Sequence, residues 1–143
     1  IFSTPFDIES ADFLERLGVE AYKIASADLV NLPLIEHVAK KNKPIIISTG
    51  MSKISEIDDA IETVRSTGNK NIAVLHCNSS YPSTHSEINL KFMNNLKSLY
   101  KIPVGFSDHT TDLLASSAIA TPDNPKLNTI IVISYLERVC PWS

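Results

Sequence analysis

The sequence predicts an α/β protein built from parallel strands, and three observations point to this fold class. Short apolar runs centred near Tyr22, Ile46, Val74 and Gly105 recur at similar intervals, and a stretch with helical spacing of apolar residues fills each interval. These runs lack a polar–apolar alternation, which indicates burial on both faces, as in a parallel sheet. Polar residues follow every run, and this favours part of a (β/α)₈ TIM barrel over an open doubly wound sheet.

The composition is that of an ordinary globular protein. Of the 143 residues, 43% are hydrophobic and 20% are charged, and the net charge is −3. This balance provides no basic surface for nucleic acid or an acidic membrane, and the longest apolar runs are far too short to span a bilayer. Two cysteines make no disulfide framework and no signal peptide is recognisable. We therefore expect a cytoplasmic protein with neither nucleic-acid nor membrane partners.

Strands and helices are expected to alternate from the first residue. The expected strands are residues 1–6 (a strand end and a turn), 19–25, 44–47, 71–76 and 102–106. The expected helices are residues 7–17, a helix from residue 31, and residues 55–68, 90–100 and about 112–120. Asp7 and Asn31 are predicted N-caps, and Gly18 is a predicted stop. Ser55 and Asp58 resemble a capping box.

Several reactive side chains are expected to have no chemical role. The basic run at residues 40–43 lies at a predicted helix end, where we expect solvated cations that suit the helix dipole. His37 and His85 are expected on the surface. His76 and Cys77 are adjacent in a strand and should face opposite ways, so we interpret Cys77 as a packing residue.

Small hydroxyl and amide residues follow each predicted strand. They are Thr4, Ser26, Ser48 with Thr49, Asn78 with Ser79 and Ser80, and Ser107. Because the carboxyl ends of parallel strands meet at one mouth, these residues should converge there, and hydroxyls with backbone N–H groups suit a phosphate or carboxylate. Lys23 interrupts an apolar strand. It either points into a barrel to meet an anion or belongs to an edge strand.

The segment Val104–Thr110 ends a strand in a run of polar residues that includes a histidine. Three interpretations of His109 stay open on this pattern: a metal ligand, a general acid or base, or a structural histidine with satisfied partners.

Five motifs make residues 1 to about 120 resemble the sialic acid synthase family, which includes N-acetylneuraminate, legionaminate and pseudaminate synthases. The motifs are FSTPFD (2–7), YKIAS (22–26), IISTGM (46–51), HCNSSYP (76–82) and GFSDHT (105–110). The resemblance implies a (β/α)₈ transferase that condenses phosphoenolpyruvate with an N-acylated mannosamine-type sugar, giving a sialic-acid-like nonulosonate and phosphate. It also implies a homodimer and a divalent metal, Mn²⁺ or Mg²⁺, that polarises the sugar aldehyde.

The same resemblance implies roles for individual residues. The residues that it implies bind phosphoenolpyruvate are Thr4, Lys23, Ser26, Ser48 and Ser107. Asn78 and Ser79 match a further contact region, and Tyr81 lies on the sugar side. Asp28 matches an acidic residue near the sugar, and His109 matches one of two metal-binding histidines. The expected catalytic residues are Lys23, Asp28 and His109.

The resemblance ends after Ala120. We interpret residues 1–120 as a partial TIM-barrel domain with the first two βα units absent. Residues 121–143 form a divergent segment, either a degraded last strand or unrelated sequence. The second metal-binding histidine of the family would fall near Val139, which cannot bind a metal.

We therefore expect the chain by itself to be inactive or severely impaired as a synthase. Two alternatives stay open: a non-catalytic fragment that binds a sugar or phosphate, and a related phosphoenolpyruvate-dependent 3-deoxy-sugar-acid synthase.

Overall fold

One parallel sheet organises the part of the chain that the computed structural model describes, residues 1–112, 114–119 and 132–134. The strands follow one another in chain order across the sheet, and each pairs in parallel with the next. They are β1 (Phe2–Ser3), β2 (Ala21–Ile24), β3 (Ile45–Ser48), β4 (Ile72–Cys77), β5 (Val104–Asp108) and β6 (Val132–Ser134). A doubly wound sheet would reverse its strand order at a switch point, so this sequential order is that of a barrel.

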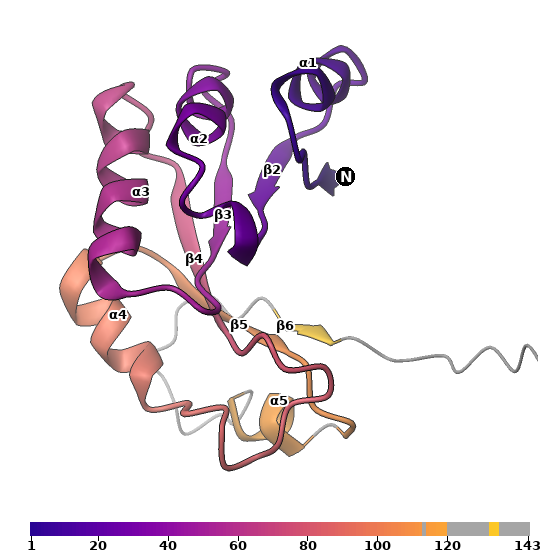
Figure 1. Ribbon diagram of the computed structural model, residues 1–143, viewed down its shortest axis with the longest axis vertical. Coiled ribbons are helices and arrows are strands. Elements are labelled where there is room, and N and C mark those ends of the chain that lie inside the picture. The colour runs from indigo at the N-terminus through magenta and orange to yellow at the C-terminus, as the bar shows by residue number, and fades with distance from the viewer. Residues whose placement is uncertain (113, 120–131, 135–143) are drawn as a thin grey trace, which may run out of the picture.

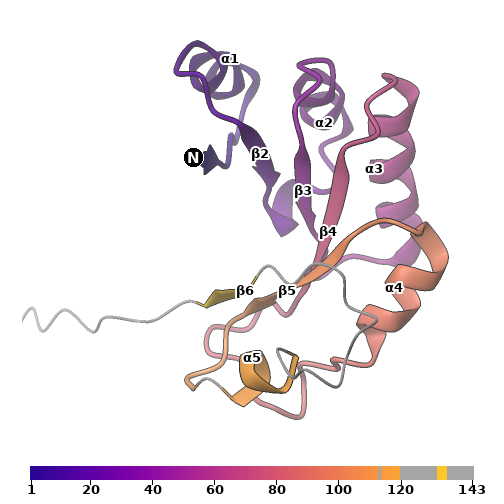
Figure 2. The ribbon, with the colours of Figure 1, turned by 180° about the vertical axis from the view of Figure 1, so that it is seen from behind.

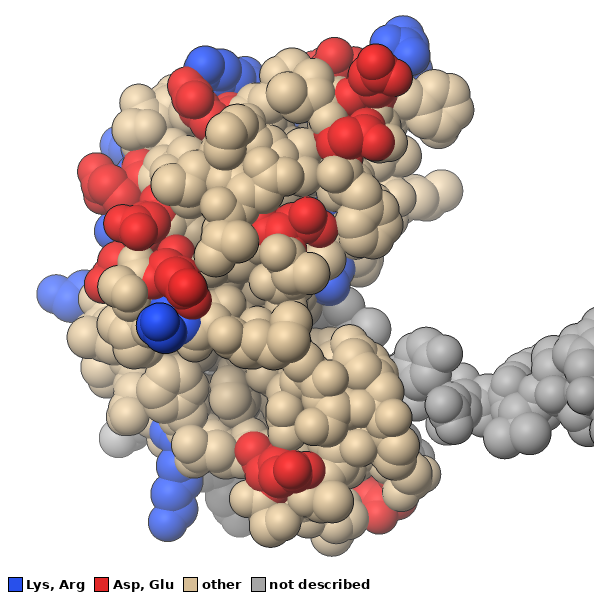
Figure 3. Space-filling model, in the orientation of Figure 1, with Lys and Arg blue, Asp and Glu red and all other residues tan. Residues whose placement is uncertain are grey.

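Helices cover one side of this curved sheet (Figures 1 and 2). They are α1 (Ile8–Arg16), α2 (Leu32–Ala39), α3 (Ile54–Ser66), α4 (Phe92–Tyr100) and α5 (Leu114–Ile119), with a short 3₁₀ turn, η1 (Ser26–Asp28), after β2. In the described part of the chain, none of the helices is long and apolar enough to cross a membrane. On the face shown in Figure 3, acidic side chains gather over α3.

The predicted caps of the first two helices are confirmed. The Asp7 side chain accepts a hydrogen bond from Ser10 N at 2.6 Å, and the Asn31 side chain accepts one from Leu34 N at 3.4 Å. Gly18 follows α1 with a φ of +76°, a left-handed conformation that glycine adopts without strain. These local signals fix where α1 and α2 begin and where α1 ends.

The predicted capping box of α3 is wrong. The helix begins at Ile54, so Ser55 lies inside its first turn and Asp58 lies too far along to act as a cap. The reciprocal contact comes from Glu56, whose carboxylate accepts a hydrogen bond from Lys53 N at 2.7 Å. A Glu at the third helical position satisfies a backbone N–H that the helix itself leaves without a partner.

The hydrophobic core lies between the helices and the facing side of the sheet. The apolar residues of β2 to β5 on this side are at most 4% exposed: Tyr22, Ile24, Ile45, Ile47, Ile72, Val74, Val104 and Phe106. Strand side chains alternate between faces, so the residues between them point to the opposite side. This alternation brings Lys23, Ser48, Cys77 and Ser107 to the same face near the carboxyl ends of four adjacent strands.

The expectation of a solvated basic helix end is wrong for Lys41. Its side chain is 7% exposed, and its Nζ lies 2.5 Å from carboxylate oxygens of both Asp12 and Glu15 on α1. Asp12 also contacts Nε2 of His37 at 2.6 Å. Hydrogen bonds from Lys41 and then His37 lower the pKa of Asp12 to about 2. Lys41 is therefore covered by α1 and ties the first two helices together.

β6 lies within the segment that was predicted to diverge, and it pairs with β5 from Phe106 opposite Val132 to Asp108 opposite Ser134. The rest of that segment, with Val139, lies outside the described residues. Its interpretation stays a prediction.

Candidate functional site

A pocket of about 280 Å³ lies at the carboxyl ends of β2, β3, β4 and β5. Its lining residues are Lys23, Ala25, Ser26, Ala27, Ser48, Met51, Cys77, Ser79, Tyr81, Ser107 and His109. Seven of the predicted site residues are among them: Lys23, Ser26, Ser48, Ser79, Tyr81, Ser107 and His109. A wider hollow of about 530 Å³ beside the start of α1 and α2 contains none of the predicted site residues.

Three predicted site residues do not line this pocket. Thr4 follows β1, and Asp28 is the last residue of η1. Asn78 is not in the lining either, but its backbone carbonyl accepts a hydrogen bond from the pocket residue His109. The structure therefore brings most of the predicted set together and leaves Thr4 and Asp28 outside the lining.

Two side chains in the pocket lack the partners that buried polar groups normally have. Ser48 is 2% exposed, and its hydroxyl has no hydrogen-bond partner in the described part of the chain. Lys23 is half-buried, and no described carboxylate lies within salt-bridge distance of its Nζ. Burial lowers the pKa of Lys23, and the nearby Cys77 partly offsets that effect. Unsatisfied buried groups destabilise a fold, so their presence in a pocket points to a ligand.

His109 is held by three contacts at the edge of the pocket. Its Nδ1 donates a hydrogen bond to the carbonyl oxygen of Asn78 at 2.5 Å, and its Nε2 lies 3.1 Å from Oγ of Ser107. The Tyr81 ring stacks on the imidazole with a centroid distance of 4.2 Å. Because a carbonyl can only accept, Nδ1 carries the hydrogen, and in the neutral ring Nε2 keeps its lone pair.

A lone pair on Nε2 is what a metal ligand or a general base requires. Among the residues described, however, no group of three or more His, Cys, Asp and Glu side chains is placed to hold a metal ion. His109 is one candidate ligand, and the described residues do not complete a metal site. Its two satisfied nitrogens also fit the structural interpretation.

Asp108 faces away from the pocket, although it lies between Ser107 and His109 in sequence. Its carboxylate accepts hydrogen bonds from N and Oγ of Thr110 at 2.9 and 2.7 Å, and from Oγ of Ser116 at 2.5 Å. Burial alone would raise the pKa of Asp108, but these hydrogen bonds outweigh it and the pKa lies below its usual value. The carboxylate connects β5 to α5.

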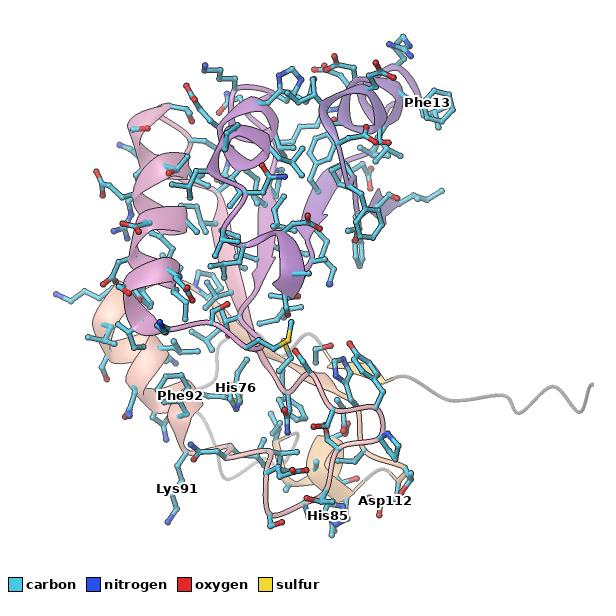
Figure 4. The ribbon with its side chains drawn as sticks, in the orientation of Figure 1. Phe13, His76, His85, Lys91, Phe92 and Asp112 are labelled. Atoms are coloured by element: carbon cyan, nitrogen blue, oxygen red, sulfur yellow. The ribbon has the colours of Figure 1, made fainter. Side chains whose placement is uncertain are left out.

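His76 also lies on the helix side of the sheet, as the alternation predicted, while Cys77 lines the pocket. Nε2 of His76 donates to the carbonyl of Ile88 at 2.7 Å, and its ring centroid lies 5.6 Å from that of Phe92 and 6.0 Å from that of Phe106. His76 and Phe92 lie beside each other in Figure 4. The two neighbours make no catalytic pair. His76 instead anchors the loop between β4 and α4.

That loop, residues 78–91, carries Ser79 and Tyr81 and is tied to the end of β5. Ser83 N donates to the carbonyl of His109 at 2.8 Å. His85 contacts Asp112 at 3.1 Å on the surface, where the two side chains lie together in Figure 4. The two loops therefore form one wall of the pocket.

Comparison with known proteins agrees with these observations. The model of the NeuB family matches residues 1–121. The chain belongs to the NeuB family.

Two curated relatives of this NeuB-family chain are synthases of nonulosonic acids. N,N'-diacetyllegionaminic acid synthase of Campylobacter jejuni is 47% identical over 118 residues, which cover 81% of the chain and 35% of that protein. Pseudaminic acid synthase of Helicobacter pylori is 43% identical over 138 residues, covering 96% of the chain and 38% of that protein. The chain thus spans little more than a third of the length of these relatives.

A solved structure supports both the family and the fold. The N-acetylneuraminic acid synthetase of Leptospira borgpetersenii, crystallised with citrate, is 34% identical and superposes with a TM-score of 0.81 over 93% of the chain and 45% of its own. The predicted resemblance to sialic acid synthases is confirmed, and so is the predicted partial barrel architecture.

The predicted site residues did not include four that line the NeuB-family pocket, Ala25, Ala27, Met51 and Cys77, or the neighbouring Gly50. Cys77 and Met51 line it, and Gly50 lies where its neighbours converge. A Cβ on Gly50 would lie 2.5 Å from Oγ of Ser79 and 2.9 Å from Oγ of Ser26. The alternation along β4 could have placed Cys77, because it puts that residue on the same face as Lys23. Gly50 and Met51 carried no comparable signal.

Proposed function

We propose that the chain provides the phosphoenolpyruvate-binding part of a sialic-acid-type synthase. The proposed reaction condenses phosphoenolpyruvate with an N-acylated mannosamine-type sugar and gives a nonulosonate and phosphate. The observation that carries this proposal is the buried Ser48 hydroxyl, which has no partner among the described residues and lies in the same pocket as the Lys23 ammonium. A phosphate or carboxylate would supply acceptors to both groups.

The remaining hydroxyls support the same ligand. Ser26, Ser79 and Ser107 also line the pocket, and each O–H can donate to an anionic oxygen. Lys23 supplies the positive charge, which is more effective when the ammonium is partly removed from water. In the proposed reaction, carbon 3 of the enol attacks the sugar aldehyde, water adds to carbon 2, and the tetrahedral intermediate expels phosphate.

Other roles are proposed from the family. Thr4 would complete the phosphoenolpyruvate site, Asn78 and Ser79 would add contacts, and Asp28 and Tyr81 would lie near the sugar. His109 would contribute one ligand to Mn²⁺ or Mg²⁺. We also propose a cytoplasmic homodimer.

Titration of Mn²⁺ tests whether His109 binds a metal. Tight binding that His109→Ala abolishes supports this role, and absence of binding favours a non-catalytic binding fragment.

Calorimetric titration of phosphoenolpyruvate into the chain tests the binding site. We expect binding that Lys23→Gln weakens by about tenfold or more, because a charge-assisted contact contributes roughly 1.5–3 kcal/mol. Lys70→Gln is the matched control, since Lys70 is exposed and distant from the pocket lining. Absence of binding, or equal loss in both variants, would contradict the proposal.

Phosphate release from phosphoenolpyruvate and N-acetylmannosamine with Mn²⁺ tests the reaction. The chain by itself is expected to be inactive or severely impaired. Turnover close to that of an intact synthase would overturn that expectation, and release of phosphate without a sugar would argue against the condensation.

A further inference from the structure

We propose that Cys77 is a positioning residue, whose thiol donates a hydrogen bond to Ser26 and thereby directs the Ser26 hydroxyl hydrogen into the pocket. This inference rests on the proposed function, because the Ser26 hydrogen is assigned as a donor to bound phosphoenolpyruvate. Cys77 is a buried free cysteine, and the sequence predicted only a packing role for it.

Three atoms, from Ser26, Gly50 and Cys77, form a cluster at the pocket. Oγ of Ser26 accepts a hydrogen bond from N of Gly50 at 3.0 Å. The same oxygen lies 3.3 Å from Sγ of Cys77, within hydrogen-bond distance for sulfur. The three residues come from the carboxyl ends of β2, β3 and β4, so the cluster joins three adjacent strand ends.

The bond between Ser26 Oγ and Cys77 Sγ can run in either direction, and the two directions leave different groups free for a ligand. A serine oxygen has one hydrogen and two lone pairs, and Gly50 N–H uses one of those lone pairs. If the thiol donates to the second lone pair, the Ser26 hydrogen remains free for a ligand. If Ser26 instead donates to sulfur, that hydrogen is lost to a weak acceptor. An anion in the pocket therefore favours the thiol as donor.

The surroundings hold the cluster in place. A Cβ on Gly50 would approach Ser79 Oγ to 2.5 Å and Cys77 Sγ to 3.2 Å. Cys77 is 7% exposed, and Ser48, at 2% exposure with no described partner for its hydroxyl, lines the same pocket. Because the Ser48 hydroxyl lacks a partner in the part of the chain that the structure describes, it indicates independently that this pocket receives a ligand with acceptor atoms.

Affinity for phosphoenolpyruvate, measured by calorimetry, tests the proposal in a Cys140→Ser background in which Cys77 is the single thiol. Cys77→Ser keeps a donor and should change Kd by less than about twofold. Cys77→Ala leaves the Ser26 hydrogen in place but removes the contact that fixes its direction, and it should weaken binding by about threefold, at the low end of one net hydrogen bond. In a Ser26→Ala background, Cys77→Ala should cause no further loss, because the thiol acts only through Ser26. Additive losses, or no rescue by serine, would overturn the proposal.

The S–H stretching band in the infrared spectrum gives a second readout that does not depend on phosphoenolpyruvate. The band should move to higher frequency in Ser26→Ala, because the thiol loses its acceptor. An unchanged band would show that the thiol does not donate to Ser26 and would overturn the proposal. If the parent chain failed to bind phosphoenolpyruvate, the proposed function would be contradicted, and this band would still decide the direction of the hydrogen bond.

Discussion

Polar side chains on the two faces of the sheet differ in whether the protein itself satisfies them. On the helix-covered face, the Asp108 carboxylate accepts hydrogen bonds from Thr110 and Ser116, and His76 donates to a backbone carbonyl. On the pocket face, Ser48 has no described partner and Lys23 has no described carboxylate nearby. Folding therefore satisfies the polar groups of one face, whereas the described residues do not satisfy Ser48 and Lys23 on the other, as the proposed ligand site requires.

Neighbours in sequence fall on opposite sides of this division. His76 and Cys77 are adjacent, as are Ser107 and Asp108, yet one member of each pair packs under the helices and the other lines the pocket. The period of two along a strand causes this separation. A motif of consecutive residues, such as Ser107-Asp108-His109, can therefore contain both pocket-lining residues and residues that pack under the helices.

Asp108→Ala should have the largest effect on stability. The substitution leaves buried donors on Thr110 and Ser116 without an acceptor, and we expect the free energy of unfolding to fall by about 3 kcal/mol. Urea denaturation measures the change. Asp59→Ala, at an exposed position of α3, should stay within about 0.5 kcal/mol. A similar small change for Asp108→Ala would remove the contrast between the faces.

The pH dependence of stability should report on His76. Burial, only partly offset by hydrogen bonding to Ile88 O, lowers the pKa of His76 from its ordinary value of 6.5. The unfolded chain therefore takes up a proton near pH 6.5 that the folded chain binds only at lower pH. Stability is full above that range and falls as the pH drops below it.

His76→Gln should reduce this acid sensitivity, as measured by urea denaturation at about pH 7.5 and about pH 5. His85→Gln, at an exposed loop position, is the control and should leave the slope nearly unchanged. Equal slopes in the parent chain and His76→Gln would mean that His76 is not the group responsible.

Ser48→Ala should have the smallest effect on folding. Removing a buried hydroxyl that has no described partner should change the free energy of unfolding by less than about 0.5 kcal/mol, or raise it slightly. Phosphoenolpyruvate affinity should nevertheless fall by about fivefold. Thermal unfolding and calorimetry measure the two effects. A marked loss of stability with unchanged affinity would place Ser48 with the structural residues.

Local signals in the sequence predicted much of the fold and most of the pocket. Capping by Asp7 and Asn31 depends on neighbours within one turn, so their identity was enough. The convergence of seven predicted residues followed from the rule that parallel strands end at one mouth. Residues such as Lys23 and Ser107 could thus be located before their contacts were known.

Features that depend on distant parts of the chain could not be predicted in the same way. Lys41 resembled a solvated helix end because its partners, Asp12 and Glu15, lie on a different helix. The contacts of Ser26 Oγ with Gly50 N and Cys77 Sγ depend on how three strand ends meet. That the described residues offer the Ser48 hydroxyl no hydrogen-bond partner is likewise a property of the assembled pocket.

Thermal unfolding of Lys23→Met, with and without phosphoenolpyruvate, tests most directly whether the pocket face is left unsatisfied for a ligand. Methionine keeps the apolar stem of lysine and removes the charge, which burial disfavours. We predict a higher unfolding temperature than the parent chain without ligand. We also predict that phosphoenolpyruvate stabilises the parent chain and does not stabilise the variant. A lower unfolding temperature combined with an undiminished response to phosphoenolpyruvate would contradict the account.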